Sequence, residues 1–140
     1  STLDVGATGG ALILGDADVA AYGNSTYEGG DAHIETNAQV DLDANAGDVT
    51  LAAVTIKSGV KGEDANYAHK YDAKATLDAN SADEFTVNGN IDIAANAIAN
   101  NEEGDSDSTA TATATAKANL DAQGDVVLNG SVDVAAAAAG

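Results

Sequence analysis

The chain has 140 residues and a formal net charge of −18, because 23 Asp and Glu residues stand against 5 Lys and Arg residues. This excess of acid argues against binding to nucleic acid or to an anionic membrane surface, both of which attract Lys and Arg. Without Cys the chain can form neither a disulfide nor a thiolate metal site, and no segment has the apolar length of a membrane span. We therefore expect a single repeat domain over residues 1–140 that does not insert into a membrane.

A dipeptide marks an internal repeat. The pair Leu-Asp recurs four times, at Leu3-Asp4, Leu42-Asp43, Leu77-Asp78 and Leu120-Asp121. Successive pairs are 39, 35 and 43 residues apart, a period at which self-similar segments form stacked arrays. We predict four degenerate repeats, approximately 1–31, 32–64, 65–107 and 108–140.

Each complete repeat begins with a long extended segment, such as residues 32–44. Apolar and polar residues alternate there with period two, which predicts a strand in spite of the helix propensity of Ala. The clearest example is the row Ala110, Ala112, Ala114, Ala116, Ala118, Leu120 and Ala122. A turn rich in Asn, Gly, Ala and Asp follows each Leu-Asp pair.

Two short strands are predicted after the turn. The first places two apolar residues inward, at Leu12/Leu14, Val49/Leu51, Phe85/Val87 and Val126/Leu128. The second does the same at Val19/Ala21, Val54/Ile56, Ile91/Ile93 and Val132/Val134, and the run Ala135–Ala139 continues its last copy. We expect the core to be carried by Leu42, Val49, Leu51, Leu77, Leu120, Val126 and Leu128.

Polar, acidic connections join the repeats at residues 23–31, 59–66 and 100–108. Carboxylate and backbone oxygens are the ligands that Ca²⁺ takes in protein loops, so these connections predict either a calcium site or a solvated acidic surface. The candidate calcium ligands are Glu102, Glu103, Asp105 and Asp107, with a second set at Glu63, Asp64, Glu28 and Asp31.

Two further sets of polar residues recur between repeats. By alternation Asp4, Asp43, Asp78 and Asp121 should form an outward ladder, held either by cations or by bonds to turn amides. His33 and His69 occupy similar positions in two long strands, which allows a shared zinc or copper site or two surface histidines. The sequence contains no nucleophile or phosphate-binding motif, and we expect no enzymatic activity.

The chain begins and ends in the middle of a repeat, and neither end resembles a polar capping repeat. A solenoid without caps exposes strands that can pair with other chains. We therefore expect each end to meet another copy or further repeats.

The segments GDVTLAAVTIKS, VNGNIDIAANAIAN and GDVVLNGSVDVAAAA resemble the repeats of large secreted bacterial adhesins of the filamentous-haemagglutinin type. In that family a Gly-Asp-hydrophobic-x-hydrophobic strand is followed by Ala, Asn and Gly. The resemblance implies a right-handed parallel β-helix, secretion, and a role in adhesion or fibre building.

Together these features predict an all-β chain folded as a parallel β-helix, or β-solenoid, of about four repeats. The length of residues 32–44 keeps a second fold open, an antiparallel β-sandwich completed by a neighbour's strand. The expected function is a structural segment of an extracellular filament, biofilm-matrix fibre or adhesin stalk that associates end to end with copies of itself. The alternative is a carbohydrate- or surface-binding module of a larger adhesin, with glycans or a cell surface as partner.

Overall fold

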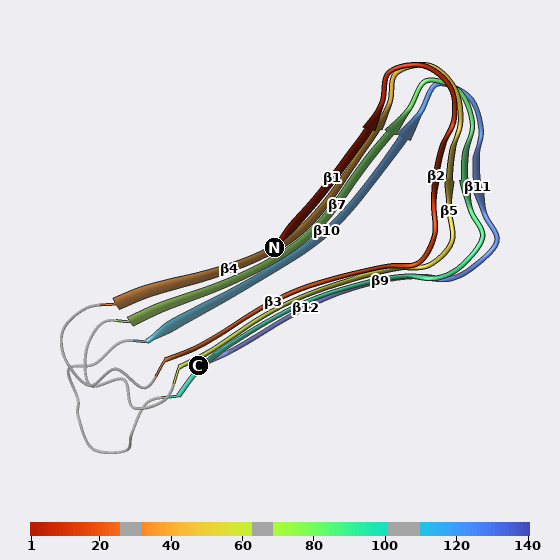
Figure 1. Ribbon diagram of the computed structural model, residues 1–140. Helices are drawn as coiled ribbons and strands as arrows, with labels where there is room; N and C mark the ends of the chain where they lie inside the picture. Colours follow the sequence, from red (N-terminus) through yellow and green to blue (C-terminus); the bar gives the residue numbers. More distant parts are fainter. Residues whose placement is uncertain (26–31, 63–68, 101–109) are drawn as a thin grey trace.

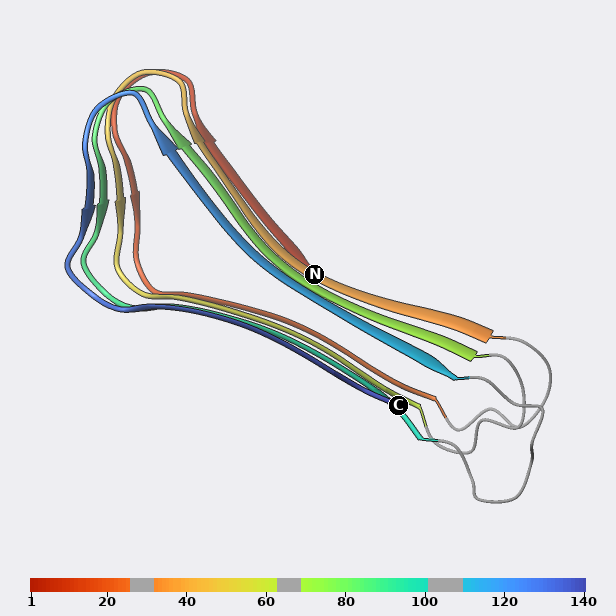
Figure 2. The same ribbon diagram turned by 180° about the vertical axis from the view of Figure 1, so that it is seen from behind.

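The structure is a computed structural model that describes residues 1–25, 32–62, 69–100 and 110–140. These residues form three four-stranded sheets in which every pair of neighbouring strands is parallel. The chain contributes one strand to each of the three sheets in turn and then repeats this order (Figures 1 and 2). This is a β-solenoid of about three turns. It confirms the predicted fold, and the parallel pairing excludes the antiparallel sandwich.

The first long sheet contains β1 (Thr2–Ala7), β4 (Ala32–Ala44), β7 (His69–Ser81) and β10 (Thr111–Ala122). The short sheet contains β2 (Leu12–Leu14), β5 (Val49–Leu51), β8 (Phe85–Val87) and β11 (Val126–Leu128). The second long sheet contains β3 (Ala17–Ser25), β6 (Val54–Gly62), β9 (Ile91–Ala99) and β12 (Val132–Ala139). We call β1–β3 rung 1, β4–β6 rung 2, β7–β9 rung 3 and β10–β12 rung 4.

The two long sheets lie against each other, and the short sheet joins them at one end of the molecule (Figure 1). Alternate side chains of all three sheets point into the space between them, as the period-two pattern predicts. The most deeply buried side chains belong to rungs 2 and 3, and they include Leu42, Leu51, Tyr71, Leu77 and Phe85. Rungs 1 and 4 cover this core on either side. Within the described residues no helix is both long and apolar enough to span a bilayer.

Three strands of the second long sheet, β3, β6 and β9, have 9 residues each and are longer than the sequence predicted. β12 has 8 residues and confirms the prediction that the run Ala135–Ala139 continues the last strand. Residues 23–25 and 59–62 therefore belong to strands rather than to the acidic connections. The reason is that the inward positions on either side of Val60 hold Ser58 and Gly62, which carry a weak hydrophobic signal but are buried all the same.

The Leu-Asp pairs of neighbouring rungs are not aligned with one another in the sheet. Leu77 lies beside Val40, two positions away from Leu42, and Asp78 lies beside Asp41. The aligned residues of the first long sheet are 37 residues apart between rungs 1 and 2 and between rungs 2 and 3, as for Thr2 and Gln39 or Ala32 and His69. They are 41 apart between rungs 3 and 4, as for Lys70 and Thr111. The inward rows are therefore Leu3–Val40–Leu77–Ala118 and Val5–Leu42–Ala79–Leu120, which set large residues beside smaller ones.

The corners of the solenoid come in two kinds. In rungs 1 and 2 the first corner spans residues 8–11 and 45–48, and the second spans 15–16 and 52–53. In rungs 3 and 4 the first corner is one residue shorter, at 82–84 and 123–125, and the second is one longer, at 88–90 and 129–131. Where the two kinds meet, the amide of Gly89 donates to the carbonyl oxygen of Ala52 at 2.9 Å, so rungs of different corner type stack directly.

Candidate assembly faces and an outer groove

The predicted calcium ligands lie outside the described residues. This applies to Glu102, Glu103, Asp105 and Asp107 and equally to Glu63, Asp64, Glu28 and Asp31. Among the residues that the structure does describe, no group of three His, Cys, Asp or Glu side chains is placed to hold a metal ion. Calcium binding by the connections therefore stays a prediction.

The prediction that Asp4, Asp43, Asp78 and Asp121 form one outward row is wrong. Because the Leu-Asp pairs are offset by two residues, the outward row is Asp4–Asp41–Asp78 and ends at Asn119 in rung 4. The Asn119 Nδ2 donates to the Asp78 Oδ1 at 3.1 Å. An amide thus replaces the fourth carboxylate and relieves the repulsion between like charges on neighbouring strands.

The two histidines point to opposite faces of the first long sheet, so they do not share a metal site. His33 is paired with Lys70, one position away from His69, and successive residues of a strand face opposite sides. On the outer face of the sheet the His33 Nε2 lies 2.8 Å from the Asp72 Oδ2, and the Lys70 Nζ lies 2.8 Å from the same oxygen. The Lys70 hydrogen bond, followed by that of His33, outweighs partial burial and lowers the pKa of Asp72 below 3.8.

On the inner face of the sheet His69 and Tyr71 fill the end of the core nearest the connections. The His69 Nδ1 lies 2.9 Å from the Tyr71 hydroxyl oxygen, and both side chains are buried. The Tyr71 ring occupies the space that a side chain on Gly62 would need. The packing of Tyr71 in this cluster therefore requires glycine at position 62.

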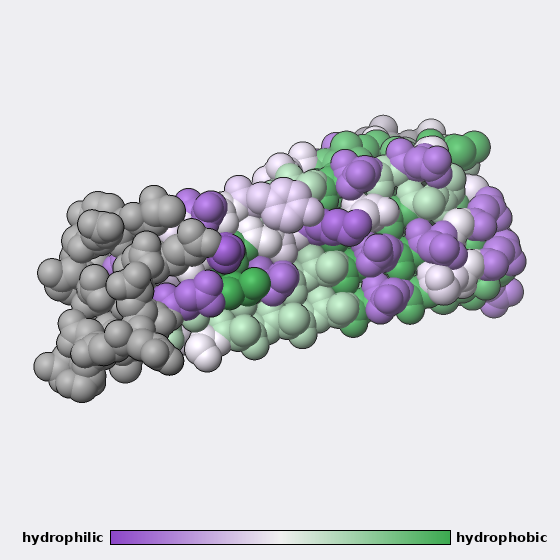
Figure 3. All heavy atoms as spheres, turned by 90° about the horizontal axis from the view of Figure 1, so that it is seen from below, coloured by the Kyte–Doolittle hydropathy of each residue, from purple (hydrophilic) through white to green (hydrophobic). Residues whose placement is uncertain are grey.

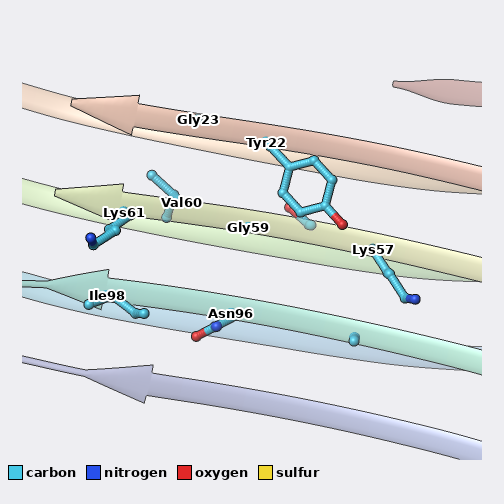
Figure 4. Close-up of a pocket in the computed structure, with 10 residues that line it drawn as sticks. Tyr22, Gly23, Lys57, Gly59, Val60, Lys61, Asn96 and Ile98 are labelled. Atoms are coloured by element: carbon cyan, nitrogen blue, oxygen red, sulfur yellow. The ribbon is translucent and has the colours of Figure 1, made fainter.

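A shallow groove of about 420 Å³ lies on the outer face of the second long sheet. Its floor is Gly59, and Figure 4 shows the Tyr22 ring leaning from β3 across β6, with Lys57 on one side and Asn96 on β9. A Cβ atom on Gly59 would lie 2.9 Å from the Tyr22 Cδ1, so the ring rests on the bare backbone. Tyr22 is nonetheless 72% exposed. The groove combines an aromatic face with a cation and an amide.

The two end rungs leave strand edges unpaired among the described residues. Rung 1 and rung 4 each have a rung on one side only, so one edge of every strand from β1 to β3 and from β10 to β12 faces outward from the stack. Val126, Leu128, Val132 and Val134 of rung 4 are 42–45% exposed, although their counterparts in rungs 2 and 3 are buried. We call these surfaces the rung 1 face and the rung 4 face.

Apolar side chains also reach the outside of the solenoid in these two rungs. In the short sheet the outward row is Ile13–Thr50–Thr86–Val127, with Thr in the two inner rungs. In the second long sheet β12 carries Ala135, Ala137 and Ala139 outward, and Figure 3 shows a band of hydrophobic atoms along one border of this side. Sequence reasoning missed this pattern, because it emerges only when outward residues are compared at aligned positions.

Comparison with protein-family models, with curated proteins and with solved structures gave no match. The fold and the surfaces described above therefore carry the functional argument.

Proposed function

We propose that this chain is a structural segment of an extracellular filament, biofilm-matrix fibre or adhesin stalk, and that it associates end to end with copies of itself. The observation that carries the proposal is the pair of unpaired faces at rung 1 and rung 4. Such edges template the addition of further strands unless they are covered. The extracellular location comes from the resemblance of the repeats to secreted adhesins.

The charge of the chain supports growth along the stack rather than sideways association. A net charge of −18 on 140 residues makes two parallel solenoids repel along their length. At the ends, by contrast, backbone hydrogen bonds and half-exposed valines are available for contact. Screening by salt should therefore promote assembly without changing its direction.

A proline at the edge of rung 4 tests this proposal. Within the stack the amides of Ala17, Val54 and Ile91 donate to the following rung, at the carbonyl oxygens of Ala53, Asn90 and Ser131. The equivalent amide in rung 4 is that of Val132, whose N–H accordingly points out of the stack. Val132 is also the first residue of β12, where strands tolerate proline.

We expect the unaltered chain to form linear filaments in negative-stain micrographs and large species in sedimentation velocity as concentration and salt rise. Val132→Pro should keep the far-ultraviolet spectrum of the fold and reduce the large species by about tenfold or more, through the lost bond and the pyrrolidine ring at the edge. The matched control is Val132→Ala, which keeps the amide. A chain that stays monomeric at all concentrations and salt levels would contradict the proposal.

The groove on the outer face supports a second candidate function, binding of a saccharide. Tyrosine offers an apolar ring face with a polar tip, and a few polar groups around an apolar floor are typical of small-molecule sites. Lys57 favours a saccharide that carries a carboxylate. A glycan array should show acidic saccharides retained by the unaltered chain and lost from Tyr22→Ala, with Tyr71→Phe, a change inside the core, as control. Equal signals from Tyr22→Ala and the unaltered chain would exclude the groove.

A further inference from the structure

We infer that the rung 4 face of one copy pairs with the rung 1 face of the next in a single parallel register that continues the register inside the molecule. This inference rests on the proposed function, because it specifies the end-to-end contact. In that register Ala122, Val127 and Val132 of one copy lie beside Ala7, Ile13 and Ala17 of the next.

The backbone groups of the two faces are complementary at this register. The amides of Leu12, Val49 and Phe85 donate to the carbonyl oxygens of Asp48, Glu84 and Asp125 in the following rung. By the same pattern Val126 would donate to Ala11 of the next copy, and Val132 would donate to Asp16.

Bonds in the reverse direction follow a second repeated pattern. The amides of Ala52, Asn88 and Asn129 donate to the carbonyl oxygens of Leu14, Leu51 and Val87 in the preceding rung. The next copy's Gly15 would accordingly donate to Leu128. Donors therefore meet acceptors in both directions along the short sheet, as a continuous parallel ladder requires.

The side chains outside the ladder fit the same register. Val127 would lie beside Ile13, which is 77% exposed in the isolated chain, and so two apolar residues would cover each other. Ala137 would lie beside Tyr22, which already rests on Gly59 in its own copy. Tyr22 would then have a small residue on either side, leaving room for its ring.

The charges fit this register better than one shifted by two residues. In the continuing register Asn119 lies beside Asp4 and Asp121 lies beside Gly6, so no carboxylates meet across the first long sheet. A shift equal to the offset of the Leu-Asp pairs would place Asp121 beside Asp4. Like charges directly opposite each other on neighbouring strands are destabilising.

Among the strand residues that the structure describes, one like-charged pair remains, in the second long sheet. There Asp133 would lie beside Asp18 of the next copy. Removing this repulsion should strengthen the contact, so Asp133→Asn is expected to raise the association constant several-fold at low salt. Asp121→Asn is the matched control and should leave it nearly unchanged.

The corner lengths pose no obstacle to the contact. A rung 4 of one copy would meet a rung 1 of the next, and these rungs have different corners. The molecule already makes the converse step between rungs 2 and 3, with parallel ladders on both sides of each corner.

Paired cysteines test the register directly, because the chain contains no Cys of its own. Neighbouring strands lie about 4.8 Å apart, which is within the Cα separation that disulfides bridge. Inside one copy the same two positions are separated by three rungs, about 14 Å, and cannot react with each other. The informative double variants are Ile13→Cys with Val127→Cys, and Tyr22→Cys with Ala137→Cys.

Mild oxidation of assembled protein should give a ladder of covalent multimers on a non-reducing gel for both double variants. The crossed pairs, Ile13→Cys with Ala137→Cys and Tyr22→Cys with Val127→Cys, place the thiols on different sheets and should give no ladder. Filaments whose matched pairs fail to crosslink, or whose crossed pairs react equally, would overturn the register and leave the proposed function standing. Absence of any assembly in the unaltered chain would instead remove the proposed function, and the register with it.

Discussion

Truncating the leucine of the Leu-Asp pair in rung 3 and in rung 4 should have very different effects on stability. Leu77 and Leu120 both open a Leu-Asp pair, but Leu77 is 0% exposed in rung 3 and Leu120 is only partly buried in rung 4. Leu77→Ala leaves a closed cavity between Val40 and Ala118, and such cavities cost about 3–4 kcal/mol. Leu120→Ala leaves a space that opens onto the rung 4 face, and we expect about 1–2 kcal/mol.

The measurement is urea unfolding followed by circular dichroism, at a protein concentration where sedimentation velocity finds monomer. Conditions that favour filaments should then raise the cost of Leu120→Ala toward that of Leu77→Ala, because a neighbouring rung would close the space. Equal losses of unfolding free energy in the monomer would refute the reasoning, since they would require rung 4 to be as well covered as rung 3.

Three further predictions concern packing, pH and calcium. Gly62→Ala should lower the free energy of unfolding by about 2–3 kcal/mol, because the new methyl group would overlap the Tyr71 ring, whereas Gly15→Ala has open space and should change it little. The lowered pKa of Asp72 stabilises the folded state above the carboxyl's ordinary value of 3.8, and this contribution is lost as the pH falls through the native pKa. Asp72→Asn should therefore lower the thermal midpoint at pH 7, and the difference should fade in acid; a constant difference, or the same loss in the exposed control Asp43→Asn, would contradict this. If the acidic connections bind calcium, a chelator should lower the thermal midpoint of calcium-treated protein, and magnesium should not restore it.

The strands and their inward faces could be predicted from the sequence because they depend on local alternation. In residues 32–44 every second side chain is small or apolar, and only an extended chain places those side chains on one side. The short strand Phe85–Val87 follows in the same way from two apolar residues around an outward Thr. The longer second strands were missed where inward positions hold Ser58 and Gly62, since burial there depends on the opposite sheet.

The register between neighbouring strands could not be predicted. Alternation fixes the face on which each residue lies, but a strand can shift by two residues along its neighbour and keep every residue on the same face. Aligning Leu42 with Leu77 preserves every face, yet it would stack large side chains in one row and leave smaller ones in the next. In the structure Leu77 lies beside Val40 instead, and Leu42 lies beside Ala79, so that large and small residues alternate. Packing between rungs therefore decides between registers that the sequence pattern allows equally.

The register also explains why the end rungs are more informative about assembly than the acidic connections that stand out in the sequence. Ile13 and Val127 are unremarkable hydrophobic residues until the register places them in one outward row with Thr50 and Thr86. An isolated four-rung stack would gain from polar residues at its two ends, where exposure is greatest, and from apolar ones nowhere on its outside. In the short sheet the observed order is the reverse, with Thr50 and Thr86 within the stack and Ile13 and Val127 at its ends. It is the order expected if the ends are the parts of the surface that another copy covers.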